Sequence, residues 1–222
     1  MAESIGARYR RLRAEIDAQA LFCGREPASV HLLGVSKKQS ADAVREAIAA
    51  GLQAIGENYV QEAKAKFAAL GAVEKHYIGH IQTNKARSLV ELFDVVQSVD
   101  REEAARALGS AAAKAGKRLR VLVQLNISPT ERFGVTPDEA LALAECIHSQ
   151  EALVLDGVMA IGPVGVSVPE LNRAFASAAK TLGRIGGTTL SIGMSGDWRE
   201  AIAAGSTMVR IGTALFGARR EG

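Results

Sequence analysis

The chain has 222 residues, of which 48% are hydrophobic and 23% charged, a balance typical of folded globular proteins rather than disordered ones. Its net charge of +3 is too small to indicate a nucleic-acid-binding surface. Cys23 and Cys146 lie far apart without CxxC spacing, which argues against a disulfide framework or a zinc cluster. No apolar run is long enough to span a membrane, and residues 1–19 lack the apolar segment of a signal peptide, so we expect a cytoplasmic protein.

Short apolar runs alternate with longer Ala-rich helical stretches along the whole chain. After an N-terminal helix over 2–21, strands are predicted at 30–36, 53–57, 76–79, 95–99, 119–127, 154–161, 188–193 and 208–211. The intervening helices are predicted over 40–50, 59–70 and 85–91, from 100 and from 136 onward, and over 169–182, 197–204 and 214–219.

Three helix starts carry capping signals. Ser40 is placed to cap the helix after the first strand. Asp100, with Glu103 three residues later, predicts a capping box. Thr136 followed by Pro137 predicts a helix with proline at its first position.

Eight repeats of strand and helix are the number required for a closed parallel barrel. We therefore predict an α/β protein whose residues 1–222 form a single (β/α)8 TIM-barrel domain with an extra N-terminal helix. A doubly wound open sheet is the alternative. It usually has fewer strands and a glycine-rich first turn, and no GxGxxG follows the first strand here.

Active sites of such barrels form at the carboxyl ends of the strands, where the first strand ends in Lys37. Lys37 shares the strand phase of Leu33 and Val35, so it is expected to point into the barrel mouth over apolar side chains. Partial desolvation there favours the neutral amine, which forms a Schiff base with an aldehyde. The alternative is a solvated lysine at a strand end, the environment that we expect for Lys38.

The turns after the last two strands are suited to bind phosphate, as those turns often do in barrels. Residues 194–197 (Met-Ser-Gly-Asp) and the pair Gly212 and Thr213 each offer a hydroxyl and a glycine at a helix start, although ordinary loops could look the same. Arg210 on the last strand is expected to point inward, which is costly unless a ligand or an acid pairs with it. It could address a heteroatom of a ligand ring, or form a salt bridge inside the barrel.

An aldehyde-trapping lysine, a phosphate cradle and a ring-facing arginine together describe a pyridoxal 5′-phosphate (PLP) site. The chain resembles the pyridoxal-phosphate homeostasis protein family, which is related to the barrel domain of alanine racemase. The matching segments run through nearly the whole chain: LLGVSKK (32–38), IGENYVQE (55–62), HYIGHIQTNK (76–85), GVMAI (157–161), LSIGMS (190–195) and GSTMVRIGTALFGAR (205–219).

The resemblance implies a role for each residue of a cofactor site. No metal ligand is expected, because the histidines lack HxH or HExxH spacing. Lys37 would be the Schiff-base lysine, and Asn58 would approach the cofactor. The Met194 backbone with Ser195, and Gly212 with Thr213, would hold the phosphate, and Arg210 would face the pyridine nitrogen. The implied function is binding and carriage of PLP within the cell, affecting amino-acid and vitamin B6 balance, without an established catalytic reaction. The implied partners are PLP and apo-enzymes that use it. The small net charge and the short apolar runs predict neither nucleic acid nor membrane as a partner, and we expect a monomer.

Two segments depart from the family pattern: Arg132 and Phe133 stand where a lysine is expected before Gly134, and residues 162–169 are short and apolar. Two other functions stay open. A weak amino-acid racemase would need a second acid–base group, for which Tyr59 at the rim is available. A Schiff-base aldolase acting on phosphorylated sugars would account for the lysine and the phosphate turns but not for Arg210.

Overall fold

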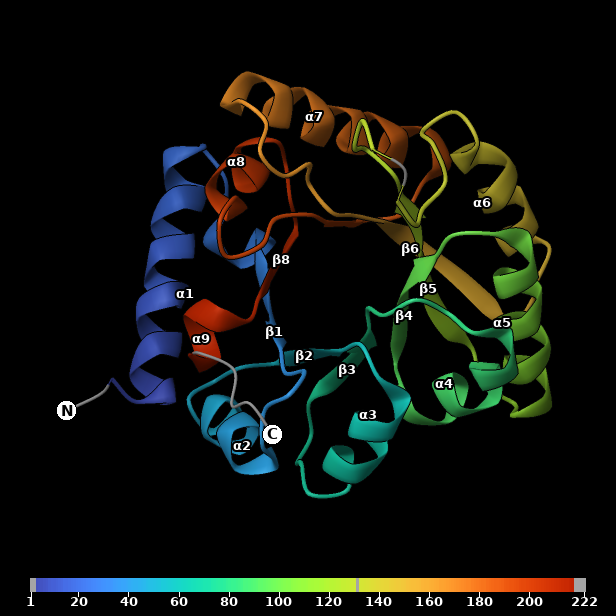
Figure 1. Ribbon diagram of the computed structural model, residues 1–222, viewed down its shortest axis with the longest axis horizontal. Helices are drawn as coiled ribbons and strands as arrows, with labels where there is room; N and C mark the ends of the chain where they lie inside the picture. The colour runs from blue at the N-terminus through green and yellow to red at the C-terminus, as the bar shows by residue number, and fades with distance from the viewer. Residues whose placement is uncertain (1–2, 131, 218–222) are drawn as a thin grey trace.

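Eight parallel strands close into a barrel in the computed structural model, which describes residues 3–130 and 132–217 (Figure 1). The strands are hydrogen-bonded in chain order, and the first also pairs with the last, which closes the sheet. They are β1 (His31–Val35), β2 (Ala54–Glu57), β3 (Glu74–Tyr77), β4 (Val95–Val99), β5 (Leu119–Leu125), β6 (Leu153–Ala160), β7 (Thr189–Ser191) and β8 (Met208–Ile211). The predicted (β/α)8 barrel is confirmed.

Helices surround the barrel. They are α1 (Ile5–Phe22), α2 (Ala41–Ala49), α3 (Val60–Phe67), α4 (Ala86–Leu92), α5 (Glu102–Lys114), α6 (Ala140–His148), α7 (Val168–Ile185), α8 (Trp198–Ala203) and α9 (Thr213–Phe216), with short 3-10 turns η1 (Pro27–Ser29) and η2 (Thr83–Lys85). The extra helix α1 packs against α2, α8 and α9 and covers the side where β8 meets β1 (Figure 1). The predicted ends at residue 2 and at residues 218–219 lie outside the described residues. Within the described part, none of the helices has the length and apolar character to cross a membrane.

The alternation of side chains along each strand separates two cores. Leu33, Ala54 and Met208 pack together inside the barrel, whereas the larger core lies between the barrel and its helices. Leu33 of β1 is level with Ala54 of β2 and with Arg210 of β8. The inward phase of β1 therefore continues from Leu33 through Val35 to position 37, as the sequence predicted.

Of the capping signals, that of Ser40 is confirmed, because its hydroxyl accepts a hydrogen bond from the Ala43 amide. The capping box at Asp100 is wrong. Helix α5 has Arg101 at its N-cap without a side-chain cap. The Asp100 carboxylate instead pairs with Arg101, at 2.6 Å, and with His80, at 3.4 Å.

The predicted helix start at Thr136 and Pro137 is also wrong, because α6 begins at Ala140. The Glu139 carboxylate accepts hydrogen bonds from the Thr136 amide, at 2.9 Å, and hydroxyl, at 2.8 Å. These contacts close a turn ahead of the helix rather than its first helical turn, so the pattern marks the turn and places the helix boundary too early.

A bulge in β6 brings β7 close to a glycine. Leu155 pairs with Val121 and Gly157 with Leu122, so Asp156 is the extra residue. Gly157 has φ +150°, and a Cβ there would lie 2.0 Å from the Thr189 carbonyl oxygen of β7. Only glycine therefore fits at this position without displacing the backbone.

Gly157→Ala is expected to lower the free energy of unfolding by about 2–4 kcal/mol. The cost of a positive φ in a residue other than glycine adds to the clash between the new Cβ and the β7 backbone. Urea denaturation measures the change. Gly183→Ala is the matched control: it lies inside α7, where a Cβ would meet nothing within 4 Å, so it should raise stability by about 0.5–1 kcal/mol. A neutral effect of Gly157→Ala would contradict this account of the bulge.

The amino-terminal end of the barrel holds a charged cluster centred on Glu74. Its carboxylate accepts from His76 Nε2 at 2.7 Å and pairs with Arg120, which lies 3.7 Å from Asp156. The hydrogen bond from His76 is the largest cause that lowers the pKa of Glu74 from 4.5 to about 2, against the opposing effect of burial. This carboxylate therefore stabilises the fold above about pH 4.5, and the stabilisation is lost as the pH falls through about 2.

Glu74→Gln is accordingly expected to make the free energy of unfolding less dependent on pH in acid. The decrease in that free energy between about pH 5 and pH 2 should be smaller by about 1 kcal/mol, a value discounted for the partial exposure of the carboxylate. Urea denaturation over a pH series measures it, with the exposed Glu151→Gln as control. An equal decrease in unfolding free energy at low pH for Glu74→Gln and the unmodified chain would contradict this role of Glu74.

Candidate functional site

A cavity of about 320 Å³ opens at the carboxyl ends of β1, β7 and β8. Its lining includes six of the seven residues proposed from the sequence: Lys37, Met194, Ser195, Arg210, Gly212 and Thr213. Residues that are far apart in the chain meet here because β8 pairs with β1 when the barrel closes. Asn58 is the member of the set that the structure does not place in the lining of this cavity.

Lys37 is half-buried in the turn after β1, and helix α3 holds both of its neighbours. The Lys66 ammonium donates to the Ser36 carbonyl at 2.6 Å, and the Lys38 amide donates to the Glu62 carboxylate at 2.7 Å. Lys38 has φ +59°, a left-handed conformation uncommon outside glycine. The turn that presents Lys37 is therefore fixed from outside the barrel.

Arg210 is buried, and its hydrogen bonds go to neutral oxygens. One terminal nitrogen donates to the Ser191 carbonyl at 2.5 Å and hydroxyl at 2.9 Å, and the other donates to the Ala160 carbonyl at 2.8 Å. Among the described residues no carboxylate forms a salt bridge with it. Burial lowers the pKa of Arg210 to about 10, and the more distant Asp197 only partly opposes the shift. The cation therefore stays charged at neutral pH beside the cavity.

The two turns proposed for phosphate differ in how much of their backbone is already used. The Met194 amide donates to the Asp197 carboxylate at 2.5 Å, so it is engaged within its own turn. Ser195 and Thr213 are exposed and line the cavity, and a Cβ at Gly196 would meet nothing within 4 Å. The hydroxyls of Ser195 and Thr213 are thus the accessible donors to an anion in this cavity.

Asn58 follows β2 on the inward phase, next to Gly79. A Cβ at Gly79 would lie 2.2 Å from the Asn58 carbonyl oxygen, so the two backbones are in close contact. The side-chain oxygen of Asn58 is buried and has no hydrogen-bond partner among the described residues. Such an orphaned acceptor at the mouth is a feature that a ligand donor could satisfy.

Comparison with known proteins identifies the family of this chain. The family described as "Alanine racemase, N-terminal domain" matches residues 12–220. The pyridoxal phosphate homeostasis protein of Pseudomonas aeruginosa is 43% identical over 99% of this chain and 97% of its own length. That of Escherichia coli is also 43% identical, over 94% of both chains. The chain belongs to the pyridoxal phosphate homeostasis protein family.

Solved structures of other proteins have the same barrel fold as this chain. PipY of Synechococcus elongatus, solved with PLP bound, is 35% identical, with a TM-score of 0.86 over 96% of this chain and 100% of that chain. Alanine racemase of Clostridium difficile is 14% identical, with a TM-score of 0.72 over 87% of this chain and 53% of that one. At that identity the racemase shows the shared barrel alone.

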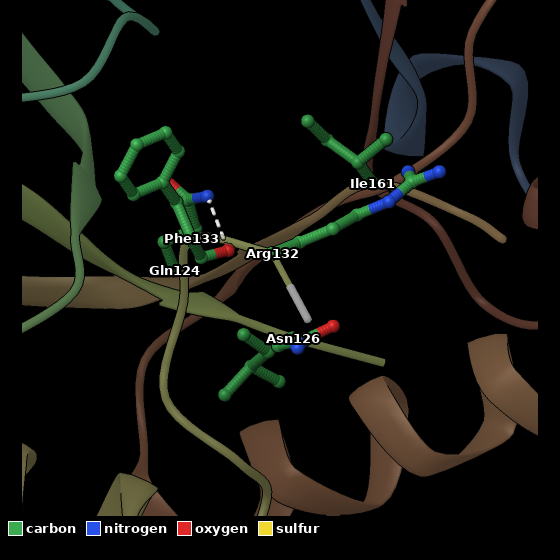
Figure 2. A pocket seen from close by; sticks show the side chains of 6 residues that line it. Gln124, Asn126, Arg132, Phe133 and Ile161 are labelled. Carbon is green, nitrogen blue, oxygen red and sulfur yellow. Dashed lines mark hydrogen bonds between the residues drawn. The ribbon is translucent and has the colours of Figure 1, made fainter. Parts of the chain in front are cut away.

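Arg132 and Phe133, at one of the two segments expected to depart from the family pattern, lie at a second cavity of about 550 Å³ (Figure 2). Its lining residues are Gln124, Leu125, Asn126, Arg132, Phe133 and Ile161. Gln124 donates to the Phe133 carbonyl at 2.9 Å, and the Phe133 ring stacks on His80 with centroids 4.1 Å apart. Figure 2 shows the Arg132 side chain extending toward Ile161. None of the residues that line this second cavity lines the Lys37 cavity.

Sequence reasoning missed a buried ion pair beneath the Lys37 turn. Glu57, at the end of β2, pairs with Lys66 of α3, and its carboxylate also accepts from the Ser36 hydroxyl at 2.7 Å. Burial raises the pKa of Glu57, while Lys66 and Ser36 oppose that rise. The available signal was the strand phase of Glu57, which it shares with the helix-facing Ile55: a carboxylate on that side of a buried strand requires a partner.

Proposed function

We propose that this chain binds PLP in the Lys37 cavity and acts in PLP homeostasis. The observation that carries the proposal is the joint lining of one cavity by an amine, a buried guanidinium and two exposed hydroxyl-bearing turns. The names of the family relatives and the PLP-bound PipY structure support it. A cavity of about 320 Å³ also lies within the usual size range of small-molecule sites.

The residues fit the chemistry of the cofactor. PLP supplies an aldehyde and an electron-withdrawing ring. Lys37 would hold the aldehyde carbon as a Schiff base, and Ser195, Gly212 and Thr213 would bind the phosphate. Asn58 lies outside the lining of this cavity, and its approach to the cofactor is proposed from the resemblance and from its buried oxygen without a partner. Because the Met194 amide is engaged by Asp197, we assign the phosphate less to Met194 than to its neighbour Ser195.

Arg210 bears on the electronic character of the bound ring. A guanidinium can only donate hydrogen bonds, so a ring nitrogen that faces it must accept and stays unprotonated. An unprotonated ring is a weaker electron sink, whereas a carboxylate partner would strengthen it. Arg210 would therefore limit how strongly the bound ring acts as an electron sink.

The racemase alternative is not favoured. Racemisation needs acid–base groups on both faces of the substrate. Tyr59 is 52% exposed at the N-cap of α3 and is not among the residues that line the Lys37 cavity.

The finer parts of the proposal rest on the sequence resemblance. We propose that residues 1–222 act as one domain, in the cytoplasm and as a monomer. Apo-enzymes that require PLP would be the recipients, and amino-acid and vitamin B6 balance would respond.

Spectroscopic titration of the purified chain with PLP and with pyridoxal tests the binding. PLP should give a saturable visible band, and pyridoxal, which lacks the phosphate, should bind at least about tenfold more weakly. The absence of saturable PLP binding would overturn the proposal.

For homeostasis, a deletion strain should show altered pools of PLP and its precursors. The original chain, but not Lys37→Ala, should restore them.

A further inference from the structure

Polar side chains form one continuous line through the barrel interior, from the buried Arg210 of β8 to the partly exposed Glu74 of β3. Arg210 donates to the Ser191 hydroxyl at 2.9 Å, and that hydroxyl donates to Gln97 Oε1 at 2.7 Å. Gln97 Nε2 lies 2.8 Å from His76 Nδ1, and His76 Nε2 lies 2.7 Å from Glu74. Ser191, Gln97 and His76 are buried, so water does not compete with the bonds between these three side chains.

With Gln97 Oε1 toward Ser191 and Nε2 toward His76, the donors and acceptors along this line fit one order. Arginine has no acceptor, so the Ser191 hydroxyl must accept from Arg210 and direct its own hydrogen to Gln97. The Gln97 amide then turns its NH2 toward His76 Nδ1. His76 must therefore carry its proton on Nε2, which donates to Glu74. Glu74 thus fixes the tautomer of His76, which in turn fixes the amide of Gln97 and the hydroxyl of Ser191.

The line ends at the residue that the proposed function places opposite the cofactor ring. Arg210 lines the Lys37 cavity, and its other two hydrogen bonds go to main-chain carbonyls of Ser191 and Ala160. Ser191 Oγ is the side-chain atom among the described residues that accepts from Arg210. Around the line the barrel interior is apolar, with Leu33, Ala54 and Met208, so packing alone does not require a polar series here.

We propose that Ser191 and Gln97 are positioning residues for the PLP ring, with His76 and Glu74 as their anchor. This inference rests on the proposed function. The Ser191 hydroxyl orients the guanidinium and sets how strongly it donates toward the cavity. Its loss would leave the terminal nitrogen bonded to the Ser191 carbonyl alone and would change the polarity at the ring nitrogen. The cofactor spectrum, which depends on that nitrogen, should therefore report the state of the line.

Ser191→Ala tests the proposal with the smallest change. Gln97→Leu removes the hydrogen bonds to Ser191 and His76, one residue further from the cavity. Ser98→Ala is the matched control, because Ser98 is a fully buried neighbour of Gln97 whose hydroxyl has no hydrogen-bond partner among the described residues. Each purified variant is titrated with PLP. The pH midpoint of the bound-cofactor spectrum is then measured, and thermal unfolding without PLP checks the fold.

Ser191→Ala should bind PLP roughly three- to tenfold more weakly and shift the spectral pH midpoint by about half a unit or more. Gln97→Leu should shift the midpoint in the same direction, and Ser98→Ala should change neither property. A folded Ser191→Ala or Gln97→Leu variant with the spectrum and affinity of Ser98→Ala would overturn the inference. Failure of the original chain to bind PLP would instead remove the proposed function itself.

Discussion

Replacing Lys66 with methionine should lower the free energy of unfolding by about 3–5 kcal/mol, because it leaves the Glu57 carboxylate buried without its cation. Glu57 is fully buried and Lys66 is 6% exposed, so water cannot replace the lost partner. The Ser36 hydroxyl would remain as a neutral donor to the carboxylate. Urea denaturation at neutral pH measures the difference.

Lys64→Met is the matched control, since Lys64 is exposed on the same helix. It should change stability by less than about 0.5 kcal/mol. A double variant, Lys66→Met with Glu57→Leu, should recover much of the loss, because it removes the uncompensated charge. If Lys66→Met were as stable as Lys64→Met, the ion pair would not hold α3 against β2.

Lys37→Ala should abolish the visible band of bound PLP and weaken binding on the order of 100-fold or more, which corresponds to about 2.8 kcal/mol. Both effects follow because the variant cannot form the covalent bond to the aldehyde, whereas the contacts to the phosphate and the ring remain. Spectroscopic titration and equilibrium dialysis measure the two effects.

The neighbouring lysine provides the control for that variant. Lys38→Ala removes an exposed side chain and keeps the amide that donates to Glu62, so PLP binding should stay within about twofold of the original. Equal losses in both variants would point to general positive charge rather than to one aldehyde-binding amine.

The barrel could be predicted because its signals are local and repeated. Strands Val95–Val99 and Met208–Ile211 match their predicted ranges, since apolar runs between turn residues define them. The alternation of side chains also placed Lys37 and Arg210 on the inward phase, and closure of the barrel brings them to one cavity. The same local reasoning failed at Asp100, whose carboxylate bonds to His80 and Arg101 instead of capping α5.

What sequence reasoning missed depends on contacts between distant segments. Glu57 and Lys66 are neighbours only because α3 packs over the end of β2. Ser191 and Gln97 lie on β7 and β4 and meet across the barrel interior, which no spacing in the chain predicts. Strand phase can indicate that a buried polar residue requires a partner, but only the folded barrel shows which partner it has.

Borohydride reduction of the PLP-loaded chain, followed by peptide mass spectrometry, tests the central claim most directly. Reduction makes a Schiff base permanent, so the modified residue can be located. The account predicts that the cofactor mass is found on the peptide at Lys37 and is lost in Lys37→Ala. A cofactor adduct on Lys38 or another lysine, or a PLP-bound chain without any adduct, would contradict it.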